Sequence, residues 1–90
     1  MDIAKAKAAK VCRDLGQRVL ELRVSREWTQ QELADAMGVD VREVRRVEAG
    51  DNLTVIMLTR LSLALNVGVG ELFERPARHR ARHPGRPRHS

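Results

Sequence analysis

The 90-residue chain is poor in aromatic residues, with one Trp, one Phe and no Tyr. Its core must therefore be aliphatic, and a single domain of about 60 to 75 ordered residues can fold on such a core without metal or disulfide. A lone cysteine, Cys12, excludes an internal disulfide and suits a reducing compartment. We interpret Cys12 as a small packing residue, with a dimer-bridging or redox-sensing thiol as the alternative.

Long apolar runs are also missing. The chain nowhere approaches the roughly 18 consecutive apolar residues of a membrane span, and its first ten residues lack the apolar stretch of a signal peptide. We therefore expect a cytoplasmic protein. Histidine is absent before residue 79, and no Cys/His cluster or phosphate-binding glycine loop occurs. The composition argues against an enzyme and predicts neither a metal site nor a cofactor.

The excess positive charge lies at the end of the chain. Residues 1–73 contain 11 Lys and Arg against 11 Asp and Glu, whereas residues 74–90 contain six Arg, one Glu, and all three His and three Pro. With little apolar surface to bury, residues 74–90 are predicted to form a disordered basic tail. The tail either adds sequence-independent affinity for phosphates or is an inert, solubilising end.

A helix with a clear beginning and end is predicted after residue 29. The hydroxyl of Thr29 can cap an early backbone N–H while Glu32 reaches back, which is the capping-box arrangement. Trp28 and Leu33 form the matching hydrophobic staple. Gly38 then ends the helix at a position that requires positive φ.

A second helix follows almost at once. The staple and cap are repeated by four further residues, Val39, Asp40, Glu43 and Val44. Only three residues separate Met37 from Val41, so the two helices must cross sharply. Residues 29–50 therefore predict a helix-turn-helix.

The second helix has two different faces. Val44 and Val47 lie on one side together with Val41, and the arginines at positions 42, 45 and 46 lie opposite. Guanidinium groups can contact phosphates or pair bidentately with guanine O6 and N7 in the major groove. A solvated charged face is the alternative interpretation, and the preceding turn favours DNA binding.

The sequence resembles the phage-repressor and Cro type of helix-turn-helix, often called XRE-like. The resemblance extends from Leu15 to Phe73 and includes Leu15–Val19, Glu21–Arg23, Trp28–Ala34, Met37–Val39, Val44, Val47–Gly50, Leu58, Leu61, Ala64–Val67 and Glu71–Phe73. It implies an all-α, five-helix repressor-like domain over residues 15–73 that binds operator DNA, commonly as a dimer. Residues 1–14 contain strong helix formers and are expected to extend the first helix.

The resemblance also implies roles in DNA contact. It places Val41, Arg42 and Arg46 at the principal base-reading positions, with Glu43 and Arg45 as flanking candidates. Valine can make only apolar contact with a thymine methyl, so direct reading should fall mainly on the two principal arginines. The residues expected at phosphates are Gln30, Thr29 and Asn52.

Two further features concern stability. The resemblance implies an ion pair between Arg23 and Glu48 that connects the first helix to the end of the second helix of the motif. Loss of one partner would cost roughly 3 to 5 kcal/mol if the pair is fully enclosed. Gly68 replaces the usual hydroxyl cap of the fifth helix, which is therefore expected to be short.

Some apolar residues are not explained by the core. Ile56 and Leu63 lie off the apolar face expected for the fourth helix, where the family usually has polar residues. We expect them, extended by Val69 and Phe73, to form a homodimer interface. Coverage by the N-terminal helix or the tail of the same chain is the alternative.

Together these features predict a sequence-specific double-stranded DNA-binding transcriptional regulator. As a dimer it would read a palindromic operator through two successive major grooves. The alternative is the DNA-binding antitoxin or interaction component of a toxin-antitoxin pair, whose apolar surplus and tail would bind a protein partner.

Overall fold

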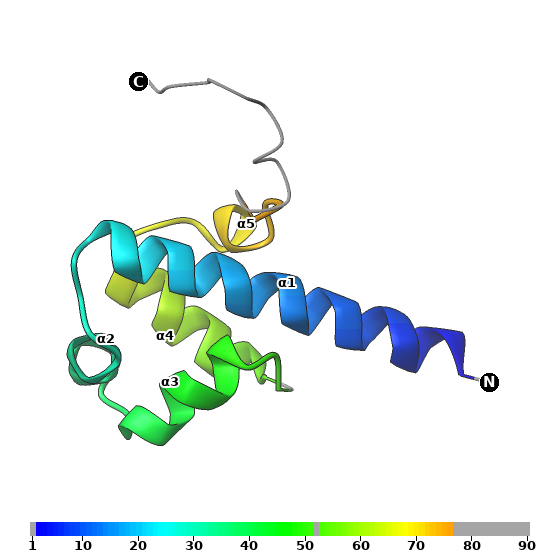
Figure 1. Ribbon diagram of the computed structural model, residues 1–90, viewed down its shortest axis with the longest axis horizontal. Helices are drawn as coiled ribbons and strands as arrows, with labels where there is room; N and C mark the ends of the chain where they lie inside the picture. Colours follow the sequence, from blue (N-terminus) through cyan, green and yellow to red (C-terminus); the bar gives the residue numbers. More distant parts are fainter. Residues whose placement is uncertain (1, 52, 77–90) are drawn as a thin grey trace.

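The computed structural model describes residues 2–51 and 53–76 and is helical throughout. Its five helices are shown in Figure 1: α1 (Ile3–Ser25), α2 (Gln30–Met37), α3 (Val41–Glu48), α4 (Val55–Leu65) and α5 (Val69–Leu72). The described residues contain no strand, and the predicted all-α, five-helix architecture is confirmed. Asn52 and residues 77–90 of the predicted tail lie outside the described residues.

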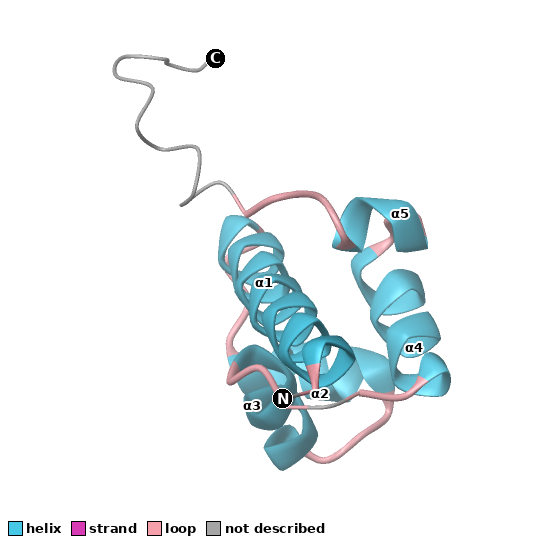
Figure 2. Ribbon diagram, turned by 90° about the vertical axis from the view of Figure 1, so that its right-hand side faces the viewer, coloured by secondary structure: helices cyan, strands magenta, loops and turns pink. Residues whose placement is uncertain are grey.

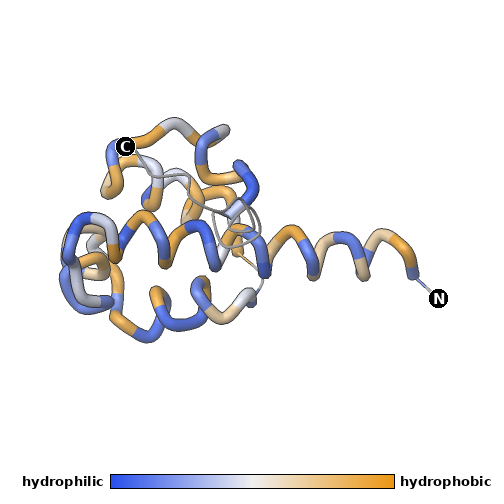
Figure 3. The backbone as a smooth tube through the Cα atoms, turned by 45° about the horizontal axis from the view of Figure 1, so that its top comes forward, coloured by the Kyte–Doolittle hydropathy of each residue, from blue (hydrophilic) through white to orange (hydrophobic). Residues whose placement is uncertain are grey.

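Helix α1 is 23 residues long and extends well beyond the other four helices. The carboxylate of Asp2 caps it by accepting a hydrogen bond from the backbone N–H of Lys5 at 3.1 Å. Only its second half is buried, at Leu15, Gly16 and Val19. Figures 1 and 3 show the first half projecting away from the domain, so the predicted lengthening of α1 is a free-standing segment.

Helix α2 begins and ends where the sequence predicted. The Thr29 hydroxyl accepts from the Glu32 backbone N–H at 3.0 Å, and the Glu32 carboxylate accepts from the Thr29 backbone N–H at 2.8 Å. The capping box is thus confirmed. Gly38 follows with φ of 73°, the left-handed conformation that a Cβ would make costly.

The cap of α3 differs from the expected one. Asp40 is the N-cap residue, but its carboxylate accepts from the backbone N–H of Arg42 rather than from that of Glu43. The Glu43 carboxylate lies 4.0 Å from Arg46 instead of returning to Asp40. Neither reciprocal bond of the predicted capping box is formed, and a single cap bond to Arg42 takes their place.

Ten apolar side chains form the core and come from all five helices. They are Leu15, Val19, Leu33, Ala34, Met37, Val44, Val47, Leu61, Leu65 and Leu72. Helices α4 and α5 follow one another along one side of α1 and close this core (Figure 2). Helix α5 has only four residues, as the missing hydroxyl cap predicted. Across the described ranges, no helix has both the length and the apolar character of a membrane span.

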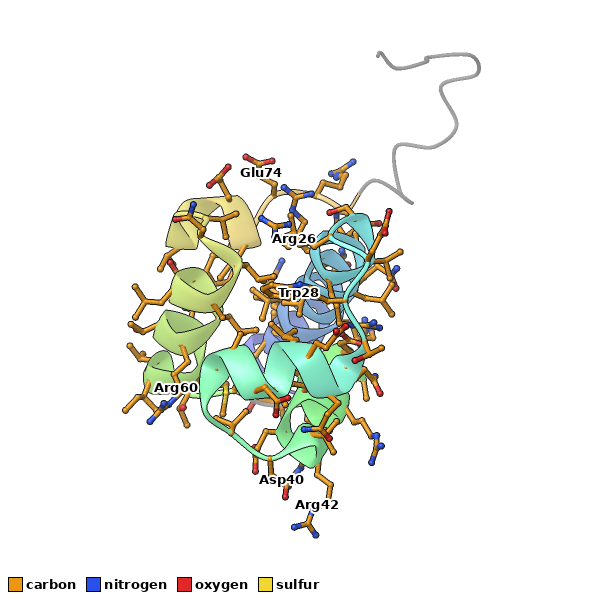
Figure 4. All side chains as sticks on the ribbon, turned by 90° about the vertical axis from the view of Figure 1, so that its left-hand side faces the viewer. Arg26, Trp28, Asp40, Arg42, Arg60 and Glu74 are labelled. Atoms are coloured by element: carbon orange, nitrogen blue, oxygen red, sulfur yellow. The ribbon has the colours of Figure 1, made fainter. Side chains whose placement is uncertain are left out.

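Three arginines bind the ends of neighbouring helices. Arg26 donates to the carbonyl oxygen of Leu65 at 2.6 Å, and Arg60 donates to that of Met37 at 3.1 Å (Figure 4 labels both arginines). Arg18 donates to the carbonyl oxygen of Glu71 at 3.1 Å. Such bonds satisfy C-terminal carbonyls and oppose the negative end of the helix dipole. These arginines are therefore part of the scaffold.

Candidate nucleic-acid interface

Helix α3 is held against α1 by an unusually close approach of the two backbones. A Cβ built on Gly16 of α1 would overlap the carbonyl oxygen of Val47 and lie 3.0 Å from that of Glu48. Only glycine leaves room for this crossing. The buried side chains of Val44 and Val47 complete the contact and fix which face of α3 remains outside.

The outer face of α3 carries the charged residues. Arg42, Arg45 and Arg46 are exposed, and Glu43 is partly buried. Together with Asp40 they line one open hollow on the surface. Val41, which was assigned to base reading, is partly buried and packs against the hydrophobic core. Val41 therefore contributes to packing at the start of α3. The exposed arginines lie on the face of α3 that points to solvent.

Each of the two principal arginines lies beside a carboxylate. Arg42 contacts Asp40 at 3.1 Å, and Arg46 lies 3.6 Å from Asp51 and 4.0 Å from Glu43. The hydrogen bond from the Arg42 side chain, followed by the one from its backbone N–H, lowers the pKa of Asp40 below its ordinary value of 3.8. The same hydrogen bond raises the pKa of the Arg42 guanidinium. Both groups are therefore charged at neutral pH.

A single carboxylate at the end of α3 joins three helices. Glu48 accepts from Arg23 Nε at 2.6 Å, from Arg23 Nη2 at 3.1 Å, and from Gln30 Nε2 at 3.0 Å. The Glu48 side chain is only 4% exposed. An acidic residue at a helix C-terminus is unfavourable by itself, and Arg23 supplies the compensating charge. The structure thus brings together the two residues that the resemblance paired, and it adds Gln30 to them.

The positions expected at phosphates lie at the start of α2. The Gln30 amide has two N–H donors, of which the bond to Glu48 uses one. The Thr29 hydroxyl accepts a hydrogen bond in the capping box and still has its own O–H to donate. Contact of either residue with phosphate stays a prediction. The third expected position, Asn52, lies outside the described residues.

The apolar residues assigned to an interface are solvent-exposed. Ile56 and Leu63 on α4 are 63% and 76% exposed, and Val69 and Phe73 are 40% and 50% exposed. Val55, which precedes Ile56 in the chain, is 78% exposed and was not among the residues expected at the interface. The described part of the chain, including the whole of α1, leaves these side chains open to solvent.

Sequence reasoning missed two residues that shape the interface. Asp40 was recognised as a cap, but its bond to the Arg42 guanidinium depends on the rotamer of the arginine. Gly16 is one of the residues that carry the resemblance, but a glycine inside a helix does not reveal from sequence what backbone lies against it. An isolated glycine inside a predicted helix, directly after the core position Leu15, is the signal that could have suggested a close packing contact.

The geometry of α2, the turn at Gly38 and the exposed basic face of α3 defines a DNA-binding protein of the helix-turn-helix class. A helix-turn-helix family profile matches residues 19–72, which is more than half of the chain. The chain therefore belongs to the XRE-like helix-turn-helix family of DNA-binding regulators. A search of curated proteins gives no match.

Two solved structures are similar to this chain over most of its length. The restriction-modification controller protein C.AhdI from Aeromonas hydrophila is 35% identical, covers 69% of this chain and 96% of its own, and has a TM-score of 0.66. A hypothetical transcription factor from Neisseria, NHTF, is 26% identical, covers 79% of this chain and 83% of its own, and has a TM-score of 0.69. The common part is thus the helical domain rather than one isolated motif.

Proposed function

We propose that the chain is a sequence-specific transcriptional regulator that places α3 in the major groove of duplex DNA. The observation that carries this proposal is the two-sided α3, in which buried valines hold the helix while Arg42, Arg45 and Arg46 stay exposed on the opposite face. Guanidinium groups on such a face can read guanine or bind phosphate. The names of the two similar structures, a controller protein and a transcription factor, support a regulatory role.

Within this proposal the residues of the motif have different tasks. Arg42 and Arg46 read bases, flanked by Arg45 and Glu43, and Val41 offers at most apolar contact beside its packing role. Gln30 and Thr29 contact phosphates at the start of α2, where the backbone N–H groups also favour an anion. The protein acts by binding rather than by catalysis.

We further infer that the regulator is a homodimer through α4 and α5. Ile56 and Leu63 are seven residues apart and lie on one face of α4, Val55 lies about 100° around the helix from Ile56, and all three are strongly exposed. A second copy would cover this face with the same residues, as a two-fold interface requires. An eight-residue recognition helix contacts only a short half-site, so a pair of them supplies the length of an operator.

Selection of bound sequences from random duplex DNA at physiological salt tests both parts of the proposal. We expect enrichment of a palindrome whose half-sites are centred about 10 base pairs, or one helical turn, apart. Recovery of unenriched DNA would contradict sequence-specific regulation. Enrichment of a single half-site without symmetry would retain specific binding and contradict the dimer.

A further inference from the structure

The carboxylate of Asp40 makes three contacts with the same arginine. Its Oδ1 accepts from the Arg42 backbone N–H at 2.8 Å and from Arg42 Nε at 3.1 Å, and its Oδ2 lies 3.4 Å from Nη2 as acceptor. Figure 4 shows the two labelled side chains together at the start of α3, with Arg42 pointing away from the body of the domain. One acidic side chain therefore caps the helix and holds the guanidinium at the same time.

The contacts select one edge of the guanidinium. A guanidinium offers five N–H groups in a planar fork, and Asp40 takes the edge formed by Nε and Nη2. The opposite edge, between Nη1 and Nη2, keeps two parallel N–H groups. Two parallel donors match the O6 and N7 acceptors of guanine. Arg42 is thus presented with the donor pair that guanine requires.

Arg46, on the same helix, has no carboxylate in the described part of the chain that contacts two of its guanidinium nitrogens. Its contacts with Asp51 at 3.6 Å and Glu43 at 4.0 Å join two separate carboxylates to different nitrogens. Neither carboxylate also caps the backbone of the arginine it faces. Of the two principal arginines, Arg42 is thus the one whose Nε and Nη2 are held by a single carboxylate.

We propose that Asp40 is a positioning residue for sequence reading, which orients Arg42 toward guanine and keeps it away from the DNA backbone. The inference rests on the proposed function, because it presumes that α3 enters the major groove. Asp40 acts in two ways. Its bonds fix the guanidinium and so reduce the rotamer entropy lost on binding, and its negative charge disfavours a phosphate at the same place. Removal of Asp40 should therefore lower discrimination more than affinity.

The test uses Asp40→Ser in the full-length protein. Serine is as good a cap as aspartate, but its side chain is too short to hold the guanidinium. Binding is measured by competition with every single-base-pair variant of the selected site and with random duplex DNA. We expect preference at one base pair to fall about two- to fivefold, the scale of an exposed ion pair, while affinity for random DNA stays equal or rises. Arg42→Ala should lose preference at that same base pair.

The matched control is Asp51→Asn, which removes a carboxylate from the same surface without touching Arg42. It should keep the preference at the base pair assigned to Arg42, and any change in preference should fall at the base pair assigned to Arg46. Helical content by circular dichroism establishes that each variant is folded. If Arg42→Ala abolishes preference at one base pair and folded Asp40→Ser retains it in full, the positioning role is overturned and the proposed function stands. If the wild-type protein prefers no sequence, the proposed function fails first.

Discussion

Gly16 of α1 packs against the backbone carbonyl of Val47 of α3, and a Cβ at position 16 would overlap that oxygen. Gly16→Ala should therefore lower the free energy of unfolding by about 1 to 3 kcal/mol, the usual cost of overpacking. We expect this net loss of stability even though alanine is intrinsically more favourable than glycine inside a helix by about 1 kcal/mol. Urea unfolding followed by circular dichroism measures it.

Gly70→Ala is the matched control, because nothing lies within 4 Å of a Cβ at that position in α5. It should leave stability unchanged or raise it by up to about 1 kcal/mol. Equal effects at positions 16 and 70 would contradict the close crossing of α1 and α3.

Arg23→Ala should destabilise the domain by about 3 kcal/mol, because it leaves the Glu48 carboxylate buried at the end of α3 without its cation. A double-mutant cycle with Glu48→Ala separates the pair from its surroundings. The control is Lys10→Ala, which breaks the exposed pair with Asp14 and should cost no more than about 0.5 kcal/mol. A loss at Arg23 as small as that at Lys10 would show that Glu48 does not depend on Arg23.

Arg46→Ala should weaken binding to the selected site by about 1 to 3 kcal/mol and relax preference at one base step. The reason is loss of a base contact rather than of fold, since the side chain is exposed. Fluorescence anisotropy with selected and random duplexes measures both affinities. Equal losses on the two duplexes would limit Arg46 to phosphate contact.

The double variant Ile56→Lys/Leu63→Lys should be monomeric at concentrations where the wild-type protein is dimeric, because two copies would bring like charges together on an apolar face. Sedimentation equilibrium measures the mass. Val24→Lys, which changes an exposed valine on α1, is the control and should remain dimeric. A monomeric wild-type protein would rule out the homodimer, and a co-purifying small protein released by the double variant would assign the face to a different partner.

The hydrogen bonds between Asp40 and Arg42 should affect how the free energy of unfolding depends on pH. The folded pKa of Asp40 lies below its ordinary value of 3.8, so the folded state binds fewer protons than the unfolded state in that range. The stabilisation is present above pH 3.8 and is lost as the pH falls through the lowered pKa. Asp40→Ser removes this contribution, so its unfolding free energy should decline less steeply below pH 3.8. Identical acid profiles would show that the bond does not persist in solution.

The boundaries of α2 and the start of α3 followed from local chemistry, the other helices followed from the family resemblance, and the finer geometry of the site followed from neither. Thr29, Glu32 and Gly38 act on backbone within four residues, so their roles can be derived from sequence. The sharing of Glu48 between Arg23 and Gln30 joins residues 18 and 25 positions apart. The sequence suggested the ion pair only through the family resemblance, and it did not suggest the third partner.

Arginines illustrate the same limit. The charge balance of residues 1–73 counts Arg26 and Arg60 only as cations, whereas in the fold they donate to carbonyl oxygens of other helices. Val41 shows the limit from the other side: the resemblance implies a groove contact, which stays a prediction, and the structure adds that the side chain is partly buried and packs against the core. Whether a side chain points to solvent or packs inside the domain depends on residues from other helices. The periodicity of its own helix does not identify those residues.

The three-way junction at Glu48 has a genetic consequence. A screen for loss of operator recognition should recover substitutions at position 23 beside those at positions 42 and 46, although Arg23 lies on α1 and faces Glu48 and Trp28 inside the protein. Such alleles would be suppressed by second-site changes that restore stability, whereas alleles at the outer arginines would not. Suppression would thus distinguish substitutions that destabilise the fold, such as those at position 23, from substitutions that remove DNA contacts at positions 42 and 46.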